Sequence, residues 1–214
     1  MSPSVRSKLG GRAFILSLCA LLALLLVNLF RWTSVEYLTP FLEPLLEIGV
    51  GVFFLVSLVW SAVHLIRKRR DGITDAFTPL AVNVATVLIV MLVPFTELTT
   101  NFDFRVHLSA RTSVVNDVLA GKYEDRIRNA GGRGDLISLP PRLSDLSSSG
   151  GEILRFRRQN DTLILFFDYR GILDSFSGFV YSTDDFPPQS GDFGSKFFAV
   201  ERLRVHWFWV SSRN

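Results

Sequence analysis

The chain contains very little cysteine and histidine. Among its 214 residues there is one cysteine, Cys19, and there are three histidines. A single cysteine cannot form an intrachain disulfide, so disulfide content does not indicate the compartment. The scarcity of thiolate and imidazole ligands also argues against a metal site built from them. We therefore expect neither a metal nor a cofactor.

The sequence also lacks the short motifs of common enzyme classes. It contains no GxSxG, HExxH or P-loop pattern, each of which carries a defined catalytic or phosphate-binding geometry. The net charge of +3 is spread thinly, since residues 1–98 carry eight basic and six acidic side chains and residues 99–214 carry 15 and 14. Neither part is basic enough to predict nucleic-acid binding. We expect no catalytic residues, no enzymatic activity and no nucleic-acid partner.

Long hydrophobic runs, in contrast, fill the first half of the chain. The composition is 48% hydrophobic with a mean hydropathy of +0.30, and three runs predict transmembrane helices at about residues 13–30, 45–66 and 79–97. An 18-residue helix is about 27 Å long, enough to cross the hydrocarbon core of a bilayer. The third run is shorter, and Pro94 is expected to kink or end it. Two spans with a re-entrant or interfacial segment remain the alternative.

The alternative interpretation of residues 13–30 is a cleaved signal peptide. The run is longer than a signal-peptide core and ends without small residues at a cleavage site. We therefore predict an uncleaved signal anchor. Residues 31–44 then form a short loop before the second span.

Basic residues predict the orientation. Four adjacent cations separate the second and third runs, namely Arg67, Lys68, Arg69 and Arg70. Three more precede the first run, namely Arg6, Lys8 and Arg12. Such clusters stay on the cytoplasmic side, and both do so when the N-terminus is cytoplasmic; a third span then places the C-terminal domain outside. The sequence thus predicts a multi-pass protein of the cell (inner or plasma) membrane, with a cytoplasmic N-terminus and an extracytoplasmic C-terminal domain.

The predicted spans contain no ionisable group near their centres, which argues against a transport pathway. Their polar residues are few, and Ser57 and Ser61 form a small-xxx-small pair typical of helix packing. We therefore interpret residues 1–98 as a membrane anchor. A small channel or carrier subunit, with Asn28 and Asn83 facing inward, is an alternative.

Residues 99–214 have the periodicity of a separate α+β domain. Apolar residues alternate from Phe102 to Leu108, which predicts a strand, and helical spacing follows from Ser109, with Gly121 as the C-cap. Further predicted strands include residues 152–158, 162–169, 176–182 and 196–211, of which 162–169 is apolar on both faces and should be central. The expected fold is three N-terminal transmembrane α-helices followed by one short helix on a mostly antiparallel sheet.

The segment from Tyr169 to Tyr181 is the candidate ligand site. Arg170, Asp174 and Ser175 could lie at the mouth of a pocket, where Arg170 would hold a carboxylate or phosphate. The pocket would be lined by three aromatic residues, Phe176, Phe179 and Tyr181.

The alternative is a structural turn. In it Arg170 pairs with Asp174, and Gly171 and Gly178 allow the chain to turn.

Two weaker candidates accompany this segment. His107 could act as a general base beside it. A basic patch would form if the strands carrying Arg155 and Arg202 were neighbours.

Taken together, the sequence favours a membrane protein presenting a non-catalytic domain that binds a protein partner or small envelope ligand, as an accessory subunit, sensor or immunity-type protein. An envelope enzyme using Arg170, Asp174 and Ser175 is the other alternative.

Overall fold

The computed structural model describes residues 3–68, 73–158, 161–171 and 175–212. The chain divides into two compact units, Met1–Thr99 and Thr100–Asn214. The first is helical and the second is built on a β-sheet.

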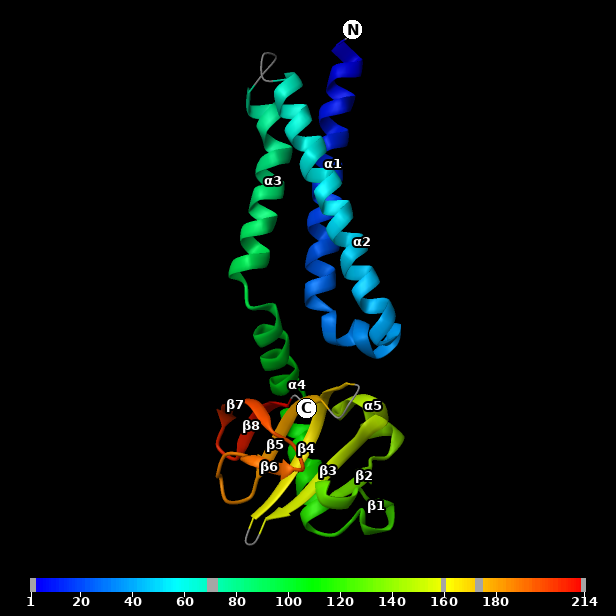
Figure 1. Ribbon diagram of the computed structural model, residues 1–214, viewed down its shortest axis with the longest axis vertical. Coiled ribbons are helices and arrows are strands. Elements are labelled where there is room, and N and C mark those ends of the chain that lie inside the picture. The colour runs from blue at the N-terminus through cyan, green and yellow to red at the C-terminus, as the bar shows by residue number, and fades with distance from the viewer. Residues whose placement is uncertain (1–2, 69–72, 159–160, 172–174, 213–214) are drawn as a thin grey trace. The chain divides into compact units, whose positions relative to one another are not determined.

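The first unit is a bundle of three helices, α1 (Pro3–Leu29), α2 (Arg31–Lys68) and α3 (Ile73–Leu92). They lie side by side and alternate in direction, so that the start of α1 and the end of α2 lie at the same end of the bundle (Figure 1). Two segments, Gly11–Leu29 and Leu42–Lys68, are long and apolar enough to cross a membrane. A third span is counted if α3 and the bent helix that follows it are taken together. Two or three candidate spans are thus confirmed.

The connection between the first two helices differs from the prediction. Residues 31–44 were expected to be a loop, but α2 already begins at Arg31. The helix runs through both Pro40 and Pro44.

The expected break at Pro94 is confirmed. Helix α3 ends at Leu92, α4 (Phe95–Leu119) begins just beyond the proline, and the two axes differ by 61°. A proline in a helix interior lacks the donor for the bond to residue i−4 and clashes with that carbonyl.

The strand predicted for residues 102–108 is wrong, because these residues belong to α4. Phe104 is buried with the later apolar residues of the helix, whereas Phe102 and Val106 are exposed. Exposed apolar side chains thus produced an alternation that is not related to a buried sheet face. The helix end was predicted correctly: Gly121 has φ +77°, and Lys122 N donates to Asp117 O at 2.9 Å, as in a Schellman motif.

The second unit is built on a seven-stranded sheet in which every pair is antiparallel, in the order β1-β2-β3-β4-β5-β8-β7. The strands are β1 (Ile127–Asn129), β2 (Asp135–Ser138), β3 (Glu152–Arg158), β4 (Asp161–Arg170), β5 (Phe176–Ser182), β7 (Phe197–Arg204) and β8 (Trp207–Ser212). The short elements are η1 (Glu124–Arg126), η2 (Gly131–Arg133), η3 (Pro141–Leu146), α5 (Ser148–Gly151) and β6 (Ser190–Phe193). The central position predicted for residues 162–169 is confirmed by β4.

The predicted single strand over residues 196–211 is instead a hairpin. Strands β7 and β8 pair with each other across a turn at Val205 and His206, whose φ of 65° lies in the left-handed region. Three strands separate β3 from β7, so the basic patch predicted from Arg155 and Arg202 does not form. Arg155 is buried and forms ion pairs with two carboxylates instead.

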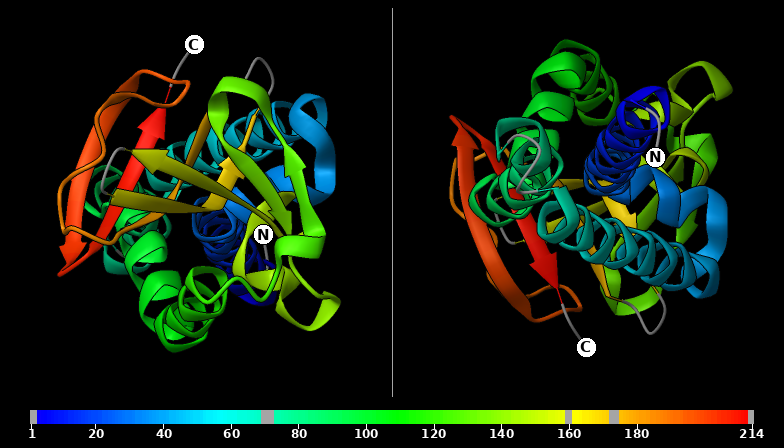
Figure 2. Two further views of the ribbon diagram at one scale, coloured as in Figure 1. Left: turned by 90° about the horizontal axis from the view of Figure 1, so that it is seen from below. Right: turned by 90° about the horizontal axis from the view of Figure 1, so that it is seen from above.

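The sheet has a core on each face. Helix α4 packs on one face, which Figure 2 shows from two directions, and its buried residues join Phe166, Phe179 and Trp207 in a single cluster. The other face carries a second cluster that contains Phe167, Phe176 and Phe193. Because neighbouring residues of a strand point to opposite faces, Phe166 and Phe167 belong to different cores. The second face carries the candidate site.

Candidate functional site

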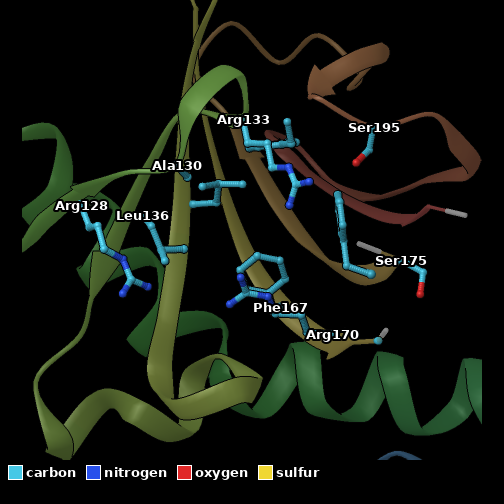
Figure 3. Close-up of a pocket in the computed structure, with 12 residues that line it drawn as sticks. Arg128, Ala130, Arg133, Leu136, Phe167, Arg170, Ser175 and Ser195 are labelled. Carbon is cyan, nitrogen blue, oxygen red and sulfur yellow. The ribbon is translucent and has the colours of Figure 1, made fainter. Parts of the chain in front are cut away.

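A cavity of about 290 Å³ opens on the second face of the sheet (Figure 3). It is lined by Arg128, Ala130, Arg133, Leu136, Leu154, Phe167, Arg170, Gly171, Ser175, Phe176, Phe193 and Ser195. The lining combines apolar side chains, three arginines and two serines. No acidic residue is present among these described lining residues.

The apolar part of the cavity follows from strand alternation. Residues Leu136, Leu154 and Phe167 point to the second face from β2, β3 and β4. The ring of Phe176 meets that of Phe167 edge to face at 5.7 Å between centroids, and Phe193, from β6, lies 6.5 Å from Phe176. Phe167 and Phe193 thus both pack against Phe176, which restricts the movement of the three rings.

The three arginines come from separate elements. Arg128 lies in β1, Arg133 closes η2 and Arg170 ends β4. Figure 3 shows Arg133 reaching toward the labelled Phe167 from the opposite side of the cavity. All three side chains line a partly enclosed apolar space, in which a charge is less screened than in water.

A single carboxylate holds two of these arginines. Glu152 accepts a hydrogen bond from Arg128 Nη2 at 2.9 Å and another from Arg170 Nη1 at 3.0 Å. The Arg170 guanidinium also lies 5.2 Å from the ring centre of Phe167. One negative charge therefore orients two positive charges among the described residues.

Two glycines of the predicted turn have different structural roles. Gly171 N donates to Ser175 O at 2.8 Å, which closes the connection between β4 and β5 at the cavity. Gly178 lies within β5, where a Cβ atom would be 2.2 Å from Phe166 O. The expectation that Gly178 serves a turn is therefore wrong. Glycine is needed at this position because β4 and β5 approach each other too closely for a side chain.

The structure brings together some of the residues selected from the sequence. Arg170, Ser175 and Phe176 line the cavity, whereas Asp174 lies outside the described residues. The described partner of Arg170 is Glu152. Whether Arg170 and Ser175 bind a ligand stays a prediction.

Two predicted lining residues belong to the opposite face. Phe179 stacks on Phe104 of α4 at 5.5 Å, and Tyr181 stacks on His206 at 5.5 Å. Both side chains belong to or pack against the α4-side core, so the expectation that they line the pocket is wrong. Alternate residues of β5 point to opposite faces of the sheet. Phe176 therefore faces the pocket, whereas Phe179 and Tyr181 face α4.

Arg128, Arg133 and Phe193 were missed by the sequence analysis. They come from β1, η2 and β6, and they lie near Arg170 only because β1, β2, β3 and β4 are successive neighbours in the sheet and β6 contacts β3 and η2. Arginine next to a glycine-rich turn is too common a pattern to have identified them.

His107 belongs to a separate polar group under α4. Its Nδ1 lies 2.7 Å from Asp103 Oδ1, and Asp103 Oδ2 also accepts from Arg111 Nη2 at 2.7 Å. Arg111 is buried against the Phe179 ring at 4.2 Å. Burial and the nearby Asp103 carboxylate raise the pKa of Asp168 to about 6. This group lies on the α4 side of the sheet, so the structure does not bring His107 to Ser175.

The cavity therefore places arginine side chains beside an apolar surface, while the polar residues of α4 are engaged in internal contacts. No protein-family model, curated protein or solved structure matches this chain.

Proposed function

We propose that this is an integral membrane protein whose helical unit anchors a non-catalytic, extracytoplasmic binding domain. The observation that carries the binding role is the cavity, in which three arginines surround a phenylalanine-lined space. Such a lining provides affinity and orientation, and its described residues supply no carboxylate or imidazole for proton transfer. An accessory subunit, a sensor and an immunity-type protein would each use a domain of this kind.

The packing of the bundle supports placement in a bilayer. Its interior holds small and polar side chains with no exposed surface, namely Ala13, Ser17, Ala20, Ser57, Ser61, Ala76, Asn83 and Thr86. Its outward side chains include large apolar ones, such as Leu22, Leu26, Leu45, Ile48, Val52, Leu55, Val59, Leu88 and Met91. Water would oppose this distribution, whereas lipid tails favour it.

Hydrogen bonds within the bundle support an anchor over a channel. Asn83 Nδ2 donates to Ser61 Oγ at 2.8 Å and to Ser17 Oγ at 3.1 Å. Asn83 Oδ1 accepts from Ser57 Oγ at 3.3 Å. These side chains come from all three helices and satisfy one another, as expected for helix packing in lipid.

The orientation rests on charge. The end of α2, with Arg67 and Lys68, lies at the same end of the bundle as the start of α1 (Figure 1). Arg69 and Arg70 lie outside the described residues. Together with the basic N-terminal segment, these residues favour a cytoplasmic location for that end and an extracytoplasmic C-terminal domain in the cell (inner or plasma) membrane.

Reporter fusions test this proposal. A reporter that is active only outside the cytoplasm, fused after Asn214, should be active, and one that is active only inside should work when inserted at Gly72. Replacing residues 67–70 by Gln should reduce both signals, whereas the control replacement of Arg202 and Arg204 should not. An inactive C-terminal reporter in the unaltered chain would contradict the orientation.

A further inference from the structure

We propose that the cavity binds a small organic anion in which a phosphate or carboxylate is attached to a compact apolar group. This inference rests on the binding role proposed above and specifies its ligand. Arg128 and Arg170 select the anion, and the phenylalanine rings select the apolar group.

The arginine geometry favours an anion over a neutral ligand. Arg128 and Arg170 each use one terminal nitrogen on Glu152, which leaves other N–H groups of both side chains available, because a guanidinium has five donors in a planar fork. Phosphate and carboxylate match that fork. Two guanidinium groups that share one carboxylate also tolerate a second anion better than a single guanidinium group paired with that carboxylate would.

The apolar wall explains why a bare inorganic ion is not the best ligand. Leu136, Leu154 and Phe167 present carbon atoms to the cavity, and covering them with an apolar group removes that surface from water. The volume of about 290 Å³ lies at the lower end of the range for ligand pockets. It therefore fits a single ring or a short chain and not an extended polymer.

Calorimetry on the full chain in detergent micelles tests this inference. Phenyl phosphate is the probe, and inorganic phosphate and phenol are the matched controls for its two parts. Dihexanoyl phosphatidate tests whether the phosphate comes from a lipid. We expect phenyl phosphate to bind at least about tenfold more tightly than either part alone, because each part meets only half of the site.

Four variants, one of them a control, locate the binding. Arg128→Gln and Arg170→Gln should each weaken phenyl phosphate binding by about 10- to 100-fold, the range for losing hydrogen bonds to a charged group. Arg202→Gln is the control, because Arg202 pairs with Asp185 outside the cavity lining. Ala130→Phe should abolish binding by filling the cavity, with the thermal transition retained as evidence of folding.

The outcomes separate this inference from the proposed function. Binding of phenyl phosphate that depends on both arginines supports the site and a soluble ligand. Arginine-dependent binding of dihexanoyl phosphatidate alone supports the site and a lipid source. If neither probe binds, or if Arg202→Gln weakens binding as much as Arg170→Gln, the inference is overturned. The reporter fusions are unaffected by that result, so the membrane-anchored domain is judged independently.

Discussion

Asp168 should make the folded domain less stable at neutral pH than at mildly acidic pH. Its pKa rises from 3.8 to about 6, first because of burial and second because of the Asp103 carboxylate. The Arg111 guanidinium and the Trp209 side chain act in the opposite direction, but burial and Asp103 outweigh them. The folded protein therefore holds a proton on Asp168 that the unfolded chain releases between about pH 4 and pH 6.

The sign and size of the effect follow from this difference. A raised carboxyl pKa adds stability that is complete below the unfolded pKa and is lost as pH rises through about 6. Each tenfold change in the acid dissociation constant corresponds to about 1.4 kcal/mol, so the loss is at most about 3 kcal/mol. Asp168→Asn, which cannot ionise, should therefore stabilise the domain by about 1–3 kcal/mol at pH 8 and have little effect at pH 4.5.

Urea unfolding of the full chain in micelles measures this difference. Two of the four tryptophans, Trp207 and Trp209, lie in the sheet, so replacing Trp32 and Trp60 by Phe makes fluorescence report on the domain. Other carboxyls act in the opposite sense, because Arg155 lowers the pKa of Glu124, and its contribution is lost on acidification. Comparing Asp168→Asn with the parent at each pH cancels such groups. Equal stability of the two proteins at pH 8 would refute the reasoning.

Three other substitutions test the packing. Trp207→Ala should destabilise the domain by about 3–5 kcal/mol in urea, because the ring is buried in the α4-side core; a change below about 1 kcal/mol would contradict that placement. Gly178→Ala should cost more than about 1 kcal/mol by forcing β4 and β5 apart at Phe166 O, which amide exchange in both strands would detect. Asn83→Ala should cost about 1–2 kcal/mol in detergent-driven unfolding of the bundle, and unchanged helix association would count against the polar core.

The features that could be predicted from the sequence are those whose signal is local. Hydropathy identifies candidate spans without knowledge of their partners, and Pro94 ends α3 through its own covalent structure. Gly121 ends α4 because the left-handed conformation costs glycine little. The sequence of β4 is apolar on both faces, which predicts a central position in the sheet because both faces must be covered.

The failed predictions come from patterns that two structures share. Residues 102, 104, 106 and 108 satisfy a period of two, but 104, 108 and 111 satisfy a helical period as well. Packing decides between them, since Phe104 and Arg111 are buried by the sheet while Phe102 is exposed. Likewise, nothing local required the chain to turn at Val205, because neither glycine nor proline marks that position.

The lining of the cavity is harder to predict from the sequence than the secondary structure is. Its lining extends from Arg128 to Ser195, and no stretch between them carries the whole pattern. Arg170 could be selected because it is flanked by glycine and aromatic residues, but its relation to Arg128 exists only because Glu152 lies at the start of β3, two strands from β1 and next to β4. A group of arginines brought together by strand order cannot be recognised until that order is known. Once the order is known, Glu152 explains how Arg128 and Arg170 are held near each other.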